Sequence, residues 1–528
     1  MTRGWVRVAL GLSIALAARA QEAPPPGGDE DPAALRRRLD ELESKVRALE
    51  SERAAPAEPA PAAEPAPAGT GPAPLATSAP VDSSAVGVSV GEAGEGLLLE
   101  LPLSVKVKLR GHYRLRGEFR DPRDYRIPGT FGRPATENPD SQEDFLVQRV
   151  WLGFEFTVKE HLRASVAVQD VRFWGDTPVG QENAELSLRE GWVELHHPFD
   201  LPLDVRAGRD IVPTFGDGRL FSAIDPWGPV TRLWDALRVT YEPEGWVLTG
   251  FAANLREAQV QVPRGDDNDD FWISGIYASN RMIKGVELDS YLFWRVLSDD
   301  VFLSEPRGGN GFVARAGDRK DFTAGARVKV EQGPVGATAE GVFQWGDQAG
   351  DTVQAWAAAA RAWVKLPLGD DQPKVRLVGE YAYATGDEDP NDGRNQTFDA
   401  IFPFGHFYHG HMDLVGWANI HALTTQLVVG LPKPVEWLEL HADGHAFWLD
   451  KTKDAWFAAS RAPIRRQPNG SADSFLGSEL DLYLQVRLWE KRVFIWTGYS
   501  HFWTGKYVRE TGKSEDQRWA FLMLEVNF

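Results

Sequence analysis

The sequence contains no cysteine, only 4 methionines, and no apolar run of the roughly 18 residues that a membrane-spanning helix needs. Without cysteine there can be no disulfide framework, thiolate metal site or thiol nucleophile. Positive charge is also scarce: 57 Lys and Arg face 76 Asp and Glu, so a nucleic-acid partner is not expected. The chain is instead rich in Trp (20), Phe (27) and Gly (51), which favours strands and tight turns over a soluble helical protein.

The first twenty residues predict an export signal. Two arginines precede the apolar run 8–18, and the Ala-Arg-Ala of residues 18–20 fits a small-x-small cleavage site. We therefore expect residues 1–20 to be a signal peptide, cleaved after Ala20, and the protein to leave the cytoplasm.

The next two stretches predict a helix and a spacer. Within residues 32–53, apolar side chains recur at alternating spacings of four and three, at Leu35, Leu39, Leu42, Val46 and Leu49. This is a coiled-coil seam too short to be stable alone, so residues 35–49 predict a homo-oligomer, with a solvated charged helix as the alternative. Residues 54–97 carry eight prolines between 54 and 80 and predict an exposed, flexible Ala/Pro-rich linker.

From residue 98 onward the hydrophobic period is two, which predicts strands. Odd positions of residues 105–120 are apolar, aromatic or Gly, whereas the even positions include Lys106, Lys108, Arg110, Arg114, Arg116 and Arg120. We expect about eighteen strands, near 105–120, 145–158, 162–174, 187–196, 203–211, 233–242, 246–254, 271–279, 286–296, 319–331, 335–345, 353–366, 374–385, 419–431, 435–449, 477–490, 492–503 and 517–528.

Short turns alternate with long polar loops between these strands. Such a pattern predicts an all-β fold, a transmembrane antiparallel up-and-down β-barrel over residues 98–528, in the bacterial outer membrane with the N-terminal segment in the periplasm. A soluble β-propeller or large sandwich is the alternative. Long strands, the lack of a blade-length repeat and tryptophans near strand ends favour the barrel, including Trp174, Trp246, Trp294, Trp345, Trp363, Trp448 and Trp503.

The polar strand faces then line the lumen, because an outward Lys or Arg at the bilayer midplane costs about 2–4 kcal/mol. Eighteen strands leave an aqueous bore rather than a packed interior. Basic rows in such a bore select for anions. Parity adds Arg149 and Arg238 to the basic residues of 105–120 as pore-lining candidates.

Several motifs resemble the alginate-export family of outer-membrane proteins. They are AGRDIVPTFGDGRL (207–220), WDALRVTY (234–241), GEYAYATGDEDP (379–390), residues 397–420, DGHAFWLDKTKDAWF (443–457) and GYSHFWTGKYV (498–508). The family's Arg209, Asp217, Arg219, Arg232 and Asp235 are retained, whereas Asp210, Phe215, Trp234 and Ala236 depart from its pattern. The resemblance implies an eighteen-stranded barrel whose arginine-rich constriction conducts a polyuronate, and it adds Arg172 and Arg209 to the pathway. The terminal Phe528 resembles the signal read by the barrel-insertion machinery.

Other constellations are weaker. His406, His409 and His411 predict a structural or exposed histidine cluster rather than a metal site. The acidic run 387–393 lacks the closing Glu of a calcium loop. Neither Ser500-His501 nor His441-Asp443-His445 carries the marks of an activated nucleophile or an oxyanion hole. We therefore expect no enzyme, no metal and no cofactor.

Three functions remain open. The first is an export channel for an anionic, alginate-like polyuronate that moves by passive diffusion and works with periplasmic export partners. The second is a general anion-selective porin for small solutes. The third is a structural or adhesive barrel whose lumen is closed by loops. Outer-membrane lipid is an expected partner of all three.

Overall fold

A computed structural model describes residues 87–90, 97–101, 105–121, 125, 143–175, 184–223, 227–256, 271–304, 313–369, 371–389 and 392–528. The predicted signal peptide, the predicted coiled-coil helix and most of the predicted linker lie outside these residues. Residues 81–528 form one compact unit.

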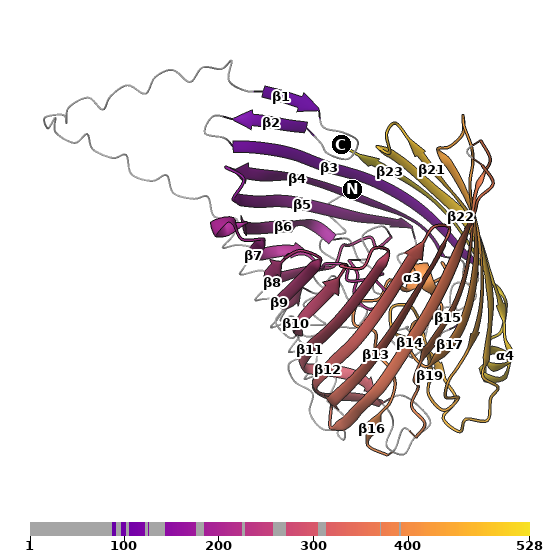
Figure 1. Cartoon of the computed structure of the whole chain (residues 1–528). Helices are drawn as coiled ribbons and strands as arrows, with labels where there is room; N and C mark the ends of the chain where they lie inside the picture. Colours follow the sequence, from indigo (N-terminus) through magenta and orange to yellow (C-terminus); the bar gives the residue numbers. More distant parts are fainter. Residues whose placement is uncertain are drawn as a thin grey trace, which may run out of the picture. The chain divides into compact units, whose positions relative to one another are not determined.

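Eighteen antiparallel strands form a closed barrel (Figure 1). They are β3 (Val105–Asp121), β4 (Glu143–Val158), β5 (Leu162–Gly175), β6 (Ala184–His196), β7 (Leu203–Ile211), β8 (Leu233–Tyr241), β9 (Trp246–Arg256), β10 (Phe271–Asn280), β11 (Val286–Ser304), β12 (Val313–Gln332), β13 (Val335–Gln348), β14 (Asp351–Leu366), β15 (Lys374–Ala384), β17 (Ile420–Gly430), β18 (Leu438–Trp448), β21 (Phe475–Leu488), β22 (Val493–Thr504) and β23 (Gln517–Asn527). Each pairs with the next, and β23 pairs with β3 to close the ring. The barrel and its strand positions are as predicted.

The remaining elements are short. A hairpin of β1 (Gly87–Val90) and β2 (Leu97–Leu101) extends the sheet beyond the first half of β3, and most of it lies in the stretch that the composition assigns to a linker. The others are β16 (Arg394–Asn395), β19 (Ala455–Phe457), β20 (Pro463–Arg466), η2 (Pro198–Asp200), α3 (Gly405–Tyr408) and α4 (Lys506–Thr511). None of the described helices is long and apolar enough to cross a membrane.

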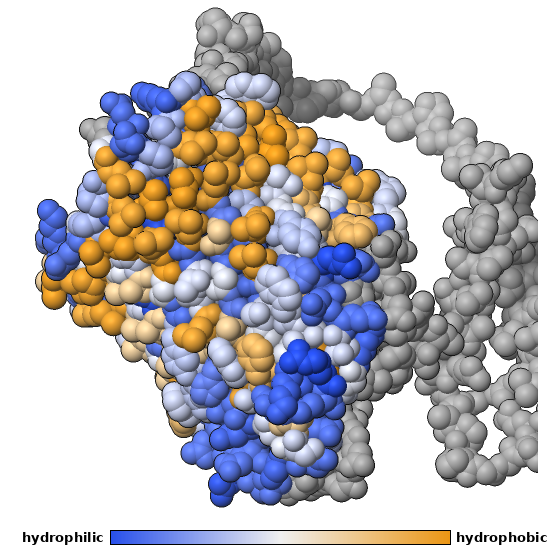
Figure 2. Space-filling view, turned by 90° about the vertical axis from the view of Figure 1, so that its right-hand side faces the viewer, coloured by the Kyte–Doolittle hydropathy of each residue, from blue (hydrophilic) through white to orange (hydrophobic). Residues whose placement is uncertain are grey.

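The outer face of the barrel is apolar, as the alternation predicts. Large hydrophobic side chains that alternate with polar ones are exposed on it, among them Trp174, Trp246, Trp294, Trp345 and Trp503. Figure 2 shows hydrophobic residues gathered across the upper part of one face and hydrophilic residues at its lower end. This is the surface expected of strands in contact with lipid.

The lumen differs from the predicted aqueous bore. Three long connections fold back into it; we call their described residues, 212–223 with 227–232, 397–418 and 450–474, the first, second and third inner segments. Their apolar side chains join inward-facing residues of the wall in one buried cluster that includes Phe221, Phe293, Phe402 and Trp456. Loop residues can fill a bore that the strands alone leave open, and a local alternation pattern carries no information on where long loops lie.

The inner segments are joined to one another through their backbones. Ser222 N–H donates to the Phe402 carbonyl at 2.8 Å, and Phe402 N–H donates to the Leu220 carbonyl at 2.9 Å. Gly416 N–H donates to the Phe457 carbonyl at 2.9 Å, linking the second and third segments. These bonds satisfy backbone groups that burial would otherwise leave unpaired.

Candidate substrate pathway in the barrel lumen

The basic row of β3 faces the lumen. Its apolar alternate Phe119 is exposed on the outer face, whereas Arg114 and Arg116 are buried against the first inner segment. Lys106, Lys108, Arg110 and Arg120 share this inward parity and keep part or all of their surface accessible. The predicted orientation of the first strand is therefore the one observed.

Neighbouring strands add more basic side chains to this wall, which we call the basic wall and define as the inward faces of β3–β8. By register its described basic residues are Lys106, Lys108, Arg110, Arg114, Arg116, Arg120, Arg149, Arg163, Arg189, Arg206 and Arg238. Among the described side chains on the same faces, the acidic residues are fewer: Glu118, Glu155, Glu190, Glu194, Asp204 and Asp210. These described side chains carry a positive surplus.

Part of that charge is paired across strands. Arg110 lies 2.8 Å from Glu190 and 3.5 Å from Glu155. Arg206 binds Glu194 at 2.7 Å and Asp210 at 2.9 Å. Asp210 also lies 3.3 Å from Arg238. Arg110, Arg206 and Arg238 remain 20–24% exposed, whereas Glu190, Glu194 and Asp210 are buried, so an anion in the lumen can reach the guanidinium of each pair.

Three of the predicted pore-lining arginines do not line open space. Arg114, Arg116 and Arg149 are only 1–2% exposed, because the first inner segment covers them. Arg114 donates to the Gly228 carbonyl and Arg116 to the Trp227 carbonyl, both at 2.5 Å. Arg116 also stacks on the Trp227 ring, with its guanidinium carbon 3.9 Å from the ring centroid. These arginines hold the inner segment to the wall.

Arg189 belongs to the same group, although parity places it on the outer face. A register shift in the β5–β6 pairing lies between Ala167 and Val168, so that Arg189 and Glu190 both turn inward. Arg189 donates to Gln169 at 3.2 Å and to the Thr231 hydroxyl. A β-bulge of this kind leaves no clear mark in an alternation pattern.

Arg172 and Arg209 lie on the opposite face from the one expected. Arg172 shares the outward parity of the exposed Trp174 and binds Asp170 on its own strand at 2.6 Å. Arg209 lies opposite Asp235 in the β7–β8 register and binds it at 2.5 Å, on the face that exposes Leu237. Both had been placed on the pathway by resemblance, and we exclude them from it.

The comparison with known proteins decides the family. The family model described as alginate export matches residues 105–521, which covers the whole ring of strands except its last few residues. The chain belongs to the alginate export family. Together with the closed barrel, this identifies an outer-membrane channel.

A solved structure agrees with this chain at the level of the fold. Acinetobacter baumannii OccAB4 is 9% identical and superposes with a TM-score of 0.50 over 80% of this chain and 98% of its own. Pseudomonas aeruginosa OpdO is 12% identical, with a TM-score of 0.49 over 80% of this chain and 97% of its own. At such identities the likeness to OccAB4 concerns the fold alone. Among curated protein sequences, none matches the chain.

The alginate-export motif residues of the first inner segment anchor it across the lumen. Asp217 binds Arg327 of β12 at 3.0 Å and accepts from the Thr338 hydroxyl at 2.9 Å. Arg219 binds Glu380 of β15 at 2.7 Å and stacks on Tyr408. Although burial disfavours its charged form, Glu380 holds the pKa of Arg219 above its ordinary value. Asp217 and Arg219 thus fix the first inner segment to the wall of the barrel.

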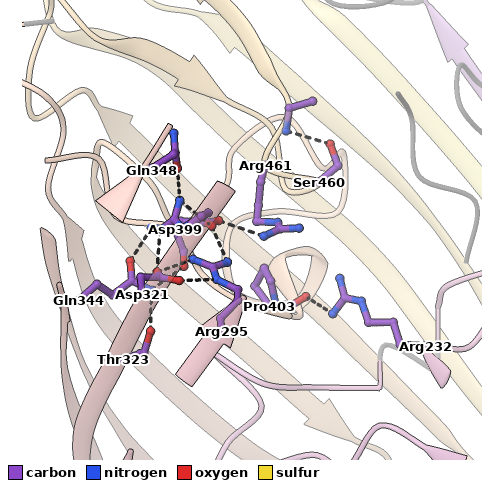
Figure 3. A network of polar contacts seen from close by, with 12 residues as sticks. Arg232, Arg295, Asp321, Thr323, Gln344, Gln348, Asp399, Pro403, Ser460 and Arg461 are labelled. Carbon is purple, nitrogen blue, oxygen red and sulfur yellow. Dashed lines mark hydrogen bonds and ion pairs between the residues drawn. The ribbon is translucent and has the colours of Figure 1, made fainter. Parts of the chain in front are cut away.

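Arg232, the next motif residue, ties the first inner segment to the second. Its guanidinium donates to the Ser222 carbonyl at 3.1 Å and to the Pro403 carbonyl at 3.2 Å (Figure 3). Burial lowers the pKa of Arg232 to about 9, and the positive charge of Arg461 acts in the same direction.

A carboxylate latch holds the second inner segment to the wall and to the third. Asp399 binds Arg295 of β11 at 2.6 Å and Arg319 of β12 at 3.3 Å, and its other oxygen accepts from Arg461 at 3.0 Å (Figure 3). Arg295 also binds the fully buried Asp321 at 2.7 Å. Burial favours the neutral acid, but the three guanidiniums hold the pKa of Asp399 well below its ordinary range. The latch is therefore charged at neutral pH.

The wall at β18 and β21, which β22 and β23 join to the basic wall, is acidic and rich in histidine. Asp443 lies directly across from Asp481 in the β18–β21 register, and His445 lies across from Glu479. His445 and His411 approach Asp481 at 3.3 and 3.7 Å. Met412 N–H donates to Glu479 at 2.9 Å. The predicted cluster of His406, His409 and His411 is thus buried in the second inner segment rather than exposed.

Proposed function

We propose that this outer-membrane channel conducts an anionic polysaccharide, of the alginate-like polyuronate class, by passive diffusion along the basic wall. The observation that carries the proposal is the positive surplus on the inward faces of β3–β8. The accessible members of this row run the length of β3, from Lys106 near one rim to Arg120 near the other.

The pairing on this wall suits a moving polyanion. A guanidinium can exchange one carboxylate for another without losing its hydrogen bonds, because its planar fork accepts carboxylates in a bidentate manner. Arg110, Arg206 and Arg238 are already paired with carboxylates of the wall. A polyuronate carries one carboxylate per sugar, so successive sugars can take the place of the wall's own acids. Many similar weak sites keep such a chain moving.

A general porin for small anions is the second candidate. The inner segments favour it, because they fill part of the lumen with a buried apolar cluster. While these segments occupy the lumen, small solutes pass through it more easily than a polymer does. Polymer passage requires the first inner segment to move away from the arginines that hold it.

Single-channel recording tests both candidates. Refolded protein is placed in a planar bilayer under a salt gradient, and polyuronate oligomers are then added. We expect a reversal potential that favours anions and a current that longer oligomers block. Anion preference without blockade would replace the polysaccharide channel by the small-anion porin. Cation preference would contradict both.

Charge reversal localises the pathway. Lys108→Glu and Arg238→Glu change accessible side chains of the basic wall, and each is expected to shift the reversal potential towards cations and weaken blockade by oligomers. Lys284→Glu makes the same charge change at an exposed turn outside that wall and serves as the matched control. An equal shift in the control would mean that net charge, rather than the basic wall, sets selectivity.

A further inference from the structure

A compact group of possible metal ligands lies at the turn between β6 and β7, at the rim of the basic wall, to which Asp204 belongs. His196, His197 and Asp204 each offer one ligand atom, and these atoms all lie within 4.8 Å of one another. Among the described residues, no other group of His, Asp and Glu side chains meets this condition. The predicted metal candidates, His406, His409 and His411, are not part of it.

The three side chains lie close to one another. His196 Nδ1 lies 2.7 Å from Asp204 Oδ1, and the two imidazoles are stacked with ring centroids 3.9 Å apart. The site is open to solvent because His197 is exposed and the side chains of His196 and Asp204 are 19% and 27% exposed.

The backbone of the turn creates this arrangement. His197, Phe199 and Asp200 all adopt left-handed φ values, of 47°, 60° and 59°. Each such conformation is costly for a residue with a side chain. One result is that two consecutive histidines, which would point to opposite faces in a continued strand, lie against each other. Asp204 is held beside them because it is the register partner of His196.

We infer that His196, His197 and Asp204 bind a divalent transition-metal ion such as Zn²⁺. Two imidazoles and one carboxylate form a ligand set that such ions favour, whereas Ca²⁺ and Mg²⁺ prefer oxygen ligands. Donors of one Zn²⁺ lie about 3–4 Å apart, since each is about 2.0–2.2 Å from the metal. Small side-chain rotations within the observed spacing reach that geometry. Three protein ligands leave at least one coordination position for water or for a donor from another molecule.

Titration of the refolded full chain without a polyhistidine tag tests the site. Zn²⁺ is added under isothermal titration calorimetry, and Co²⁺ is added while its visible absorption is recorded. We expect one Zn²⁺ per chain, a tetrahedral-type Co²⁺ spectrum, and no binding of Ca²⁺ at the same concentrations. Absence of Zn²⁺ binding, or equal binding of Ca²⁺, would overturn the inference.

Substitutions assign the ligands. His197→Ala and Asp204→Asn are each expected to weaken Zn²⁺ binding at least about tenfold and to remove the Co²⁺ spectrum. His501→Ala is the matched control, because His501 also lies near a carboxylate, 3.8 Å from Asp516, but without a second histidine in a ligand group. Folding of each variant is checked by its heat-dependent gel mobility. Zn²⁺ binding that persists in a folded His197→Ala protein would contradict the assignment.

Discussion

At the residue scale, the burial of each arginine of the basic wall depends on the acceptor that it binds. Arg206 and Arg238 find carboxylates and stay partly accessible. Arg114 and Arg116 find backbone carbonyls and become buried. Since a buried charge is tolerated only with hydrogen-bond partners, the second pair must keep its loop in place. The basic wall therefore supplies both candidate ligand contacts and structural anchors.

Removing the Asp399 carboxylate is expected to loosen the inner segments. Asp399→Asn leaves three guanidiniums with a weaker partner and should lower the free energy of unfolding by about 2 kcal/mol. Arg295 keeps Asp321, so the barrel itself should still form. The measurement is urea unfolding of the refolded protein together with single-channel conductance, which we expect to rise. Glu388→Gln, an exposed change nearby, is the control, and an equal loss of stability there would refute a specific latch.

The outer ion pair of Arg209 and Asp235 predicts a non-additive double mutant. A lone charge on a lipid-facing position costs about 2–4 kcal/mol at the midplane and less near the interfaces. Arg209→Leu and Asp235→Leu should each destabilise the barrel, whereas the double substitution should cost less than the sum of the two. Unfolding in lipid vesicles measures the coupling. Additive losses would mean that the two residues are not paired in the membrane.

At the scale of elements, the second inner segment carries buried neutral histidines. Burial lowers the pKa of His411 to about 3, although Asp481 acts in the opposite direction. Burial also lowers the pKa of His409 well below its ordinary value. Between pH 6.5 and pH 3 the unfolded chain therefore binds more protons at these sites than the folded one. The stability that depends on these neutral rings is complete above pH 6.5 and is lost as the pH falls.

Acidification is thus expected to release residues 405–413 before the barrel unfolds. At pH 5 the lowered pKa of His411 costs the folded segment about 2 kcal/mol. Hydrogen exchange of this segment, corrected for the intrinsic effect of pH, should show less protection at pH 5 than at pH 7.5. His411→Gln should reduce the pH dependence, and the exposed His161→Gln should leave it unchanged. Protection that does not vary with pH in the native protein would contradict the prediction.

At the scale of the whole molecule, the barrel is a rigid frame and the inner segments determine how much of its lumen is open. The strands are joined edge to edge around a closed ring. The inner segments instead rest on a modest number of side-chain anchors, such as Arg232 and Asp399. Motion during transport is therefore expected in these segments rather than in the wall.

Shortening the first inner segment tests this view. Replacing residues 214–229 by a short Gly/Ser linker removes Asp217, Arg219 and Trp227 together and should raise the single-channel conductance severalfold. The anion preference should remain, because the basic wall is retained. Replacement of residues 467–472, which are exposed or partly exposed, by a linker of equal length is the control. Unchanged conductance after shortening would show that the first inner segment does not restrict the lumen.

The sequence by itself determined the barrel. Each strand is marked in the sequence by an alternation of polar and apolar residues. The sequence therefore predicted β7 at its observed bounds and placed the basic row of β3 on its observed face. This information is local, because the side chains of a strand must alternate between lipid and lumen wherever the strand sits in the ring. The family resemblance likewise rests on short contiguous motifs.

Only the tertiary structure decided what the lumen contains. The parallel bridge between Phe221 and Phe402 joins positions that are far apart in the chain. The sequence around either residue does not indicate which residue it pairs with. Parity also failed where a bulge turned Arg189 inward. The physical reason is the same in each case. Alternation records which face a strand residue occupies, whereas loop position, bulges and the choice of acceptor depend on contacts that form only when distant segments meet.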